Sequence, residues 1–546
     1  MRIPLFVIIF LQIQFLWSQQ KEALENESIQ IIQELNQPVN DSSTEEKKIY
    51  FYEEQKKDSL IESKNPSIKK PKKKRYIPTI KSMDEITVKD YKIMYMDGTD
   101  KIVDTSLSIE GEYTFNFLRK DYFEYLTFPN MGEAYNKMGY DFHEQPFTPQ
   151  MGASVKHFGY FEKEDVPYYE VPSPYTELFF KSTFQQGQNL DATLAINTSP
   201  KFNVAVSFKG FRSLGKYLSS LSRSRQFRLS SQYQTYNQKY RLRLHQTTQS
   251  LENQVNGGLT NDSDYFFQNA PNYVSADEAG NPILDEDGNE QIVFYDGFLD
   301  RNRLGTHLKA DNILKGKRYF MEHRFKIVPE IKDTTLYKMA IGYRAILENK
   351  TYQYTQMRPG IYFDETYETN SINDSISFSS LDNNLFLNYK NKILGEINVD
   401  LHHHNWDYKL GLNEYEKDTI LSNEINVSQI ATNIHWEKEA FGLKIKLSGY
   451  KSLKNQYATQ AFEFNLTRPI MNDIFVEASY KYRSQPLDFN FYLTQSDFRV
   501  YNWENNSLNN EDFRTQSIFI SHPKWGSIKG EWTSINNFTF FNNSTR

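Results

Sequence analysis

From residue 176 onward, the chain alternates apolar and polar side chains with a period of two residues. In 202–209, Phe202, Val204, Val206 and Phe208 are separated by polar or small residues. A period of two predicts β-strands, whose successive side chains point to opposite faces. The pattern recurs through 229–233, 240–244, 339–347, 385–389, 393–401, 443–449 and 476–482. We expect roughly 14–18 strands and an all-β fold.

Three features favour a transmembrane antiparallel β-barrel over a soluble exported β-sandwich, which remains the alternative. Tyr and Phe gather near strand ends, as aromatic girdles do. The polar faces also carry charge, which a water-filled lumen tolerates. Turn lengths are asymmetric, because 250–300 is long and other connections are tight. The expected tight turns are Asn237-Gln238, Asn349-Lys350, Asn391-Lys392 and Asn472-Asp473.

The chain divides into four predicted regions. Residues 1–18 have a basic start and a short apolar core, which is typical of a secretory signal peptide. Residues 19–75 are polar, end in a basic cluster and predict a disordered periplasmic tail. Residues 76–175 predict a small β-rich periplasmic or plug-like block, with a hairpin at Asp97-Gly98 and an extended segment over Glu112–Leu118. Residues 176–546 form the predicted barrel.

The composition excludes several classes of site and of function. The 546 residues carry a formal net charge of −6 and no cysteine. The missing cysteine excludes disulfides, thiolate metal sites, iron–sulfur clusters and a cysteine nucleophile, and the acidic balance disfavours nucleic-acid binding. A mean hydropathy of −0.68 with 15% aromatic residues excludes a helical membrane protein, because no later segment approaches ~18 continuous apolar residues. A barrel accommodates these values, since only every second strand residue meets lipid.

The sequence offers few candidates for metal-binding or catalytic residues. His402 and His404 share one strand face with Asp400, but no third metal ligand is fixed by spacing, so a polar lumen wall is the simpler interpretation. The acidic run 285–290 lacks the glycine spacing of a calcium loop and predicts a hairpin turn at Asp287-Gly288. No hydrolase or phosphate-loop motif occurs. We therefore expect no enzyme activity, cofactor or metal.

Basic residues cluster on the strands predicted to line the lumen. If these strands are neighbours, their side chains form a positive wall that favours anions. Pairing with Asp and Glu across strands is an equally good interpretation. The pore-lining candidates are Arg223, Arg225, Arg228, Arg241, Arg243, His245, Arg318, Arg324, His402 and His404.

Several stretches, taken in order, resemble the putative porin family of Bacteroidota outer membranes: 103–109, 112–121, 175–180, 209–217 and 256–261. The resemblance spans nearly the whole mature chain. It implies a transmembrane β-barrel in the cell outer membrane, a periplasmic N-terminal extension and a role in diffusion. Barrels of this kind end on a strand with a terminal aromatic residue, whereas this chain ends in 542–546 without one. We therefore expect the barrel to be incomplete at its C-terminus or closed by a strand elsewhere, because an open edge leaves backbone groups unpaired in lipid.

The predicted function is a porin-like outer-membrane channel for passive diffusion of small hydrophilic solutes, with mild anion preference. The alternatives are a plugged barrel that serves as a binding or assembly scaffold and the soluble adhesin. Expected partners are outer-membrane lipid, lipopolysaccharide, small hydrophilic solutes and the barrel-assembly machinery, but no nucleic acid. A homo-oligomer is left open.

Overall fold

The fold is seen in a computed structural model. It describes residues 83–105, 108–139, 146–183, 187–269, 273–275, 277, 279, 281–293, 301, 304–328, 337–360, 363, 365–367, 370–411, 422–453, 455–471 and 474–541. The predicted signal peptide, the polar tail and the terminal residues 542–546 lie outside these ranges. None of the helices in the described ranges combines the length and apolarity needed to cross a membrane.

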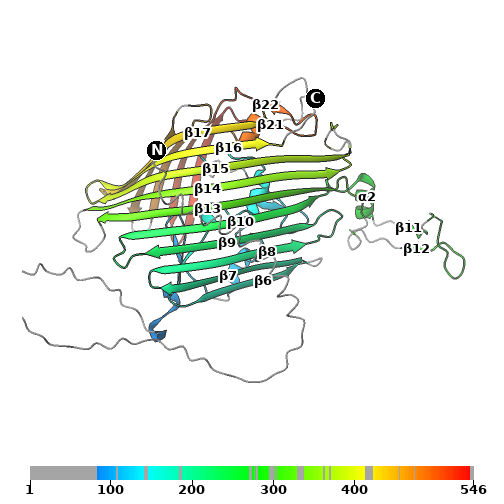
Figure 1. Ribbon diagram of the computed structural model, residues 1–546, viewed down its shortest axis with the longest axis horizontal. Helices are drawn as coiled ribbons and strands as arrows, with labels where there is room; N and C mark the ends of the chain where they lie inside the picture. The colour runs from blue at the N-terminus through cyan, green and yellow to red at the C-terminus, as the bar shows by residue number, and fades with distance from the viewer. Residues whose placement is uncertain are drawn as a thin grey trace, which may run out of the picture. The chain divides into compact units, whose positions relative to one another are not determined.

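A single 15-stranded antiparallel sheet dominates, and its strands pair in chain order (Figure 1). This confirms the all-β prediction and lies within the expected strand number. The strands are β6 (Tyr175–Thr183), β7 (Gly187–Ser199), β8 (Phe202–Ser213), β9 (Ser222–Gln234), β10 (Tyr240–Val255), β13 (Ala310–Val328), β14 (Tyr337–Met357), β15 (Ser371–Asn391), β16 (Gly395–Leu410), β17 (Glu424–Ala440), β18 (Leu443–Ser452), β19 (Gln460–Met471), β20 (Ile474–Gln485), β23 (Glu511–His522) and β24 (Gly526–Asn536).

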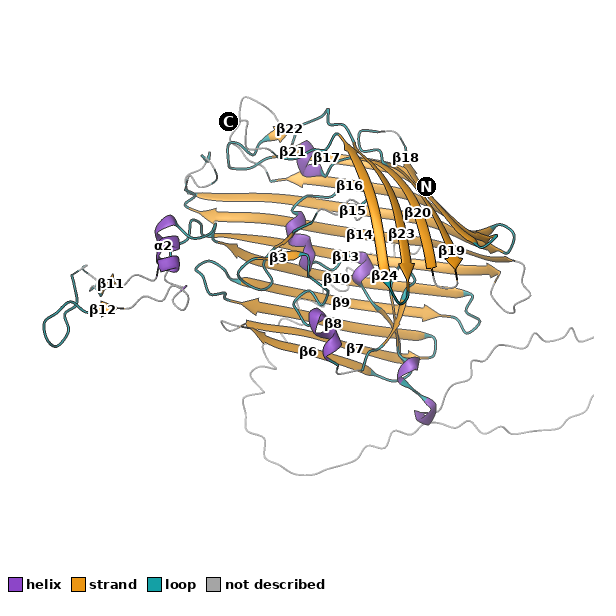
Figure 2. Ribbon diagram, turned by 180° about the vertical axis from the view of Figure 1, so that it is seen from behind, coloured by secondary structure: helices purple, strands orange, loops and turns teal. Residues whose placement is uncertain are grey.

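The sheet curls into an open barrel wall (Figure 2). Among the described residues, its edge strands β6 and β24 do not pair with each other. Strand direction alternates across the 15 strands, so β6 and β24 run the same way. An antiparallel closure therefore needs an odd number of further strands between them, and the expected closing strand stays a prediction.

Alternate side chains of each strand face opposite sides of this wall. In β9, Ser224, Gln226 and Arg228 are buried on the concave, inner side, whereas Phe227 and Leu229 face outward. The outward apolar side chains, such as Leu385 with 49% of its surface exposed, form a belt along one half of the strands. The predicted apolar sets thus belong to the outer face, as the period of two requires.

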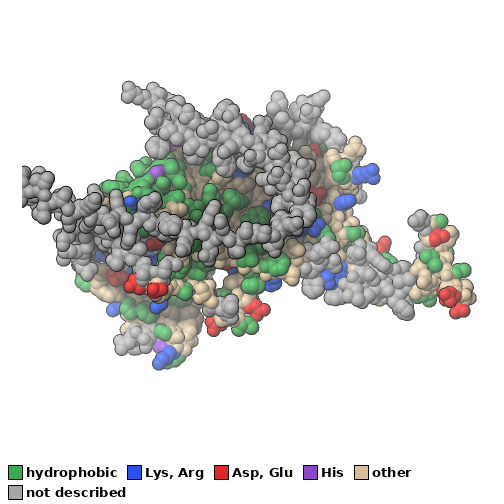
Figure 3. Space-filling view, turned by 60° about the horizontal axis from the view of Figure 1, so that its bottom comes forward, with side chains coloured by type: hydrophobic (Ala, Val, Ile, Leu, Met, Phe, Trp, Pro, Cys, Tyr) green, Lys and Arg blue, Asp and Glu red, His purple; other side chains and the backbone are tan. Residues whose placement is uncertain are grey.

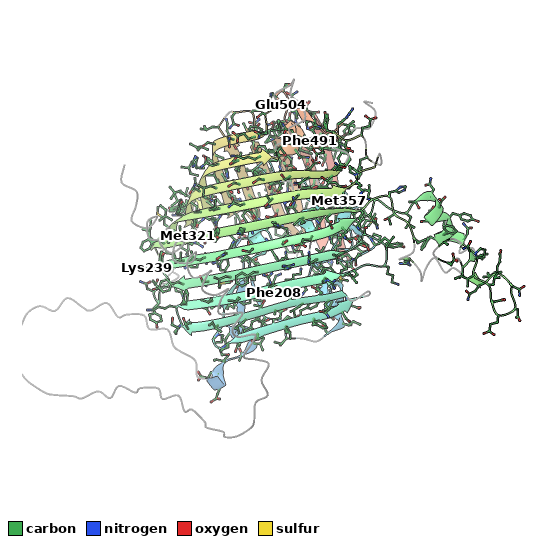
Figure 4. All side chains as sticks on the ribbon, turned by 45° about the vertical axis from the view of Figure 1, so that its right-hand side comes forward. Phe208, Lys239, Met321, Met357, Phe491 and Glu504 are labelled. Carbon is green, nitrogen blue, oxygen red and sulfur yellow. The ribbon has the colours of Figure 1, made fainter. Side chains whose placement is uncertain are left out.

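The belt lies nearer one end of the sheet, where short turns join the strands. We call this the turn end and the opposite end, with the long connections, the loop end. The predicted turns at Asn237-Gln238 and Asn391-Lys392 are present at the turn end, and Asn472-Asp473 lies outside the described residues. The prediction at Asn349-Lys350 is wrong, because both residues lie inside the long strand β14, paired with β13 and β15. Lys239 and Met357 mark the turn end and the loop end of the sheet (Figure 4).

We call residues 83–171 the plug, and its described segments from Lys92 onward lie on the inner side of the sheet (Figure 2). The predicted hairpin is present, with Gly98 at a φ of 91° in its turn. The segment Glu112–Leu118, expected to be extended, instead begins inside the 3-10 helix η3, where Thr114 Oγ1 bonds back to the Gly111 carbonyl. The plug elements are η1 (Met83–Glu85), η2 (Val88–Asp90), β1 (Lys92–Met94), β2 (Asp100–Ile102), η3 (Ile109–Thr114), β3 (Tyr125–Thr127), β4 (Tyr135–Lys137), η4 (Ser154–Gly159), η5 (Lys163–Asp165) and β5 (Tyr168–Glu170).

Two loop-end connections carry structure of their own. Between β10 and β13, α2 (Asn261–Asn269), β11 (Tyr273–Val274) and β12 (Ile292–Val293) form an arm with acidic side chains at its tip (Figure 3). The predicted turn at Asp287-Gly288 is present there, with Gly288 N–H donating to the Asp285 carbonyl. Between β20 and β23 lie α3 (Phe489–Tyr492), β21 (Leu493–Thr494) and β22 (Trp503–Glu504), which we call the inner loop with their flanking residues 486–510.

Candidate functional site: the plugged interior

The inner wall is polar and charged, but the plug covers much of it. Arg318 of β13 has no exposed side-chain surface. It donates hydrogen bonds to the Phe161 carbonyl at 2.9 Å, to Glu162 at 3.1 Å and to Glu348 of β14 at 2.5 Å. A cation of the wall is thus held by two carboxylates, one from the plug and one from the next strand.

Lys350 and Tyr160 complete this cluster, which we call the latch. Lys350 of β14 lies 3.1 Å from Glu162, and the Tyr160 hydroxyl donates to Glu348 at 2.8 Å. Burial alone would raise the pKa of the Glu162 carboxyl, but Lys350 and Arg318 lower it below its usual value. The latch therefore holds two cations and two anions, and the matched charge offsets the cost of removing them from water.

A second contact joins the plug sheet to β10. Arg243, which is 2% exposed, donates to Gln232 at 2.9 Å and to the Tyr95 carbonyl at 3.1 Å. Its neighbour His245 hydrogen-bonds the Tyr168 hydroxyl at 2.8 Å and stacks on Phe320, with ring centroids 4.5 Å apart. Both side chains bind the plug and are unavailable to a passing solute.

A third contact lies towards the loop end. Lys156 of η4 is buried and donates to Asn253 of β10, whose amide group donates to the Gly132 carbonyl at 3.0 Å. Burial lowers the pKa of Lys156 to about 7, although the negative charge of Glu133 opposes this shift. Because this buried ammonium has a polar acceptor on the wall, it fixes the plug at a defined depth.

The inner loop covers the plug and the wall at the loop end. Phe489, fully buried, packs with Tyr408, Trp406 and Phe378 of the wall. Its N–H donates to the Gln150 carbonyl at 2.9 Å, and Gln150 N–H donates to Asp488 at 3.0 Å. This reciprocal pair ties the inner loop to the plug, and burial raises the pKa of Asp488.

The histidine pair lies on the inner wall of β16. His404 Nδ1 is 2.6 Å from Asp382, and its ring lies 5.4 Å from that of His402. Asp400, the expected companion, instead accepts a hydrogen bond from Asn384 at 3.2 Å. Within the described ranges, no three His, Asp or Glu residues are grouped to hold a metal ion.

Residues 87–546 match the family described as "putative porin". The chain belongs to this family. Family membership points to a non-enzymatic barrel channel of the outer membrane. No curated protein matches the chain.

Solved structures with a similar course of the chain include two receptors and an iron transporter. They include a ferric enterobactin receptor mutant from Pseudomonas aeruginosa (9% identity, TM-score 0.41, 66% of this chain and 52% of that one). The siderophore receptor PirA from Acinetobacter baumannii has 7% identity and a TM-score of 0.43, over 66% of this chain and 51% of that one. The FrpB iron transporter from Neisseria meningitidis has 9% identity and a TM-score of 0.39, over 66% of this chain and 54% of that one. The chain spans about half the length of these proteins.

The interior of the barrel wall contains most, but not all, of the predicted pore-lining residues. Arg223 and Arg225 are a correction: they alternate with the buried Ser224 and Gln226 and therefore face outward. The remaining candidates occupy inward positions: Arg228, Arg241, Arg243, His245, Arg318, Arg324, His402 and His404. Of these, Arg228 lies over the Phe161 ring of the plug, 4.0 Å from its centroid, and bonds Asp191 at 3.1 Å.

A basic cavity of about 240 Å³ lies at the turn end of the barrel wall. Its lining residues come from six neighbouring strands, β9, β10 and β13 to β16, and from the turn between β9 and β10, so only the sheet brings them together. Arg241 and Glu322 lie 3.5 Å apart at its inner side, and Lys390 and Glu396 pair at 2.8 Å. The charged residues lining it are Lys239, Arg241, Arg324, Lys326, Lys338, Lys390 and Glu396.

The sequence analysis did not identify the four residues that surround Arg318 in the latch, two on the wall and two on the plug. Glu348 and Lys350 could have been found, because they share the inward parity of Arg344 on β14. Glu162 and Tyr160 carry no such signal. Their place on the wall depends on long-range packing across more than a hundred residues of sequence.

Proposed function

We propose that the chain is an outer-membrane channel for passive diffusion of small hydrophilic solutes, with mild anion preference and with residues 83–171 as a resident plug. The supporting observation is the basic cavity at the turn end, where six cations face one carboxylate on its lining. Charge of one sign in a confined polar lumen favours permeation of the opposite sign. Export by the signal peptide, a periplasmic tail, assembly by the barrel machinery and contact with outer-membrane lipid and lipopolysaccharide belong to the same proposal.

Reversal potentials in planar bilayers test the preference. We expect the full chain in a KCl gradient to pass chloride more readily than potassium. The double variant Arg241→Gln with Arg324→Gln should bring the permeability ratio close to one, whereas Arg468→Gln, which removes an outward cation of β19, should leave it unchanged. Cation preference in the unsubstituted protein would contradict the proposal.

The second candidate is a plugged barrel that acts as a binding or assembly scaffold. The latch favours it, because a wall arginine with no exposed surface is neutralised by the plug. Single-channel conductance separates the two candidates. A correctly folded barrel, shown by heat-modifiable gel mobility, that stays electrically silent even in a latch variant such as Glu162→Gln would favour the scaffold.

A further inference from the structure

Three cations stand on the outer face of the sheet at the border of the apolar belt. Along β9 the outward side chains run Arg225, Phe227 and Leu229 towards the turn end. Along β13 they run Lys315, Lys317 and then Tyr319 in the same direction. On both strands the cations therefore lie next to the aromatic edge of the belt, on the side nearer the loop end.

Strand register brings these cations together. Arg225 is paired with Ser250 of β10, and Ser250 is paired with Lys315. Phe227 and Lys317 likewise flank Thr248 one register row nearer the turn end. With neighbouring strands about 4.8 Å apart, the two rows place one guanidinium and two ammonium groups around a small polar surface of Ser and Thr.

This surface is a shallow groove of about 570 Å³. Its apolar border is formed by Phe208, labelled in Figure 4, and Phe227, both about two-fifths exposed. Its cationic side is formed by Arg225, Lys315 and Lys317. We call it the outer basic groove.

The groove carries uncompensated positive charge. Among the described residues, no carboxylate pairs with Arg225, Lys315 or Lys317. Glu252, one register row further towards the loop end, instead binds Arg223. Cations clustered at a membrane interface attract anionic headgroups, and salt screening confines this attraction to about a Debye length from the surface.

We propose that the outer basic groove binds a membrane lipid with a phosphorylated headgroup in the outer leaflet. Arg225, Lys315 and Lys317 contact the phosphate, and an acyl chain lies along Phe208 and Phe227. Long loops of such barrels face outward from the cell and short turns face the periplasm, which places the groove at the headgroup level of the outer leaflet. Arg offers paired donors that fit phosphate oxygens, and Lys adds point charges. The inference rests on the membrane-spanning placement in the proposed function.

Lipid retention by the full chain tests the groove. The refolded protein in detergent is mixed with bisphosphorylated lipid A, and bound lipid is counted by native mass spectrometry. We expect the triple variant Arg225→Gln, Lys315→Gln, Lys317→Gln to bind at least about tenfold more weakly. The matched control Lys438→Gln, Arg468→Gln, Lys524→Gln removes the same charge at the turn end and should bind like the unsubstituted protein.

Further probes distinguish other occupants. Dephosphorylated lipid A that binds as tightly would show that acyl contacts alone suffice, and millimolar inorganic phosphate that displaces lipid A fully would indicate a small-anion site. An unchanged lipid count in the triple variant with a smaller oligomer mass would assign the groove to a second copy of the chain. Each of these results overturns the proposal. Conductance, measured on the same samples, tests the channel separately, so loss of lipid with intact conductance leaves the proposed function standing.

Discussion

Arg318 of the barrel wall donates a hydrogen bond of 3.1 Å to Glu162 of the plug, across 156 residues of sequence. Arg318 has no exposed side-chain surface, whereas Glu162 is about two-fifths exposed. The wall cation thus depends on the plug for part of its neutralisation. Removing the plug would leave Arg318 and Lys350 with the single carboxylate of Glu348.

Neutralising Glu162 should loosen the plug. Glu162→Gln removes the charge that faces Arg318 and Lys350, and we expect the docked plug to lose about 1.5–3 kcal/mol, the range for hydrogen bonds to charged groups. Limited trypsin digestion of the plug in the folded protein measures this loss. Lys120→Gln serves as the control, because the Lys120–Asp165 pair is exposed and lies within the plug; an equal effect of both variants would refute the role of the latch.

Gly316 of β13 should be intolerant of a side chain. An added Cβ would overlap the Tyr160 ring and hydroxyl of the plug, so Gly316→Ala must push the plug away from the wall. We expect larger single-channel conductance with an unchanged barrel melting transition. Gly530→Ala in β24, where a Cβ meets nothing within 4 Å, provides the comparison. Identical conductance in the two variants would show that the plug does not limit flow.

Acid should weaken the docked plug through His157. Burial and the positive charge of Lys350 lower the pKa of this histidine to about 4 from its ordinary 6.5. The folded state therefore favours the neutral ring, and its contribution is present above pH 6.5 and lost as the pH falls towards 4. Relative to His157→Gln, the protein should lose up to about 3 kcal/mol over this window, seen as faster plug proteolysis at pH 4.5 than at pH 7.5.

Glu133 acts in the opposite sense over nearly the same window. Burial raises the pKa of Glu133 to about 7 from 4.5, so protonation on acidification favours the docked plug. Each histidine or glutamate effect is therefore measured against its own variant, His157→Gln or Glu133→Gln. If the pH profile of His157→Gln matches that of the unsubstituted protein, the assignment to His157 is wrong.

Phe489 should hold the inner loop in place. It is fully buried against Trp406 and Tyr408, and Phe489→Ala should cost about 3–5 kcal/mol locally. Hydrogen exchange of residues 487–494 measures the opening of the loop. Phe123→Ala removes a ring that is 87% exposed and should change nothing measurable. Unaltered exchange in Phe489→Ala would mean that the inner loop is held by other contacts.

Some errors of prediction concern local pattern. Arg223 and Arg225 have odd numbers on β9 and Arg228 an even one, so period two already forbids a shared face. Their grouping as pore-lining residues ignored this parity. Asn349-Lys350 has turn composition, yet it lies in β14 because pairing with both neighbours outweighs local preference.

The sequence by itself determined the all-β fold and the apolar face of most strands, because alternation is a local property that each strand displays on its own. The ordered motifs along the chain, and not the alternation, indicated the family. Only the tertiary structure decided that Tyr160, Phe161 and Glu162 sit against Arg318, that the inner loop locks onto Gln150, and that the cations of β9 and β13 converge on one outer groove. These contacts depend on strand order, register and the seating of a distant segment. Such relationships follow from packing across the whole sheet, and no periodicity within a single segment encodes them.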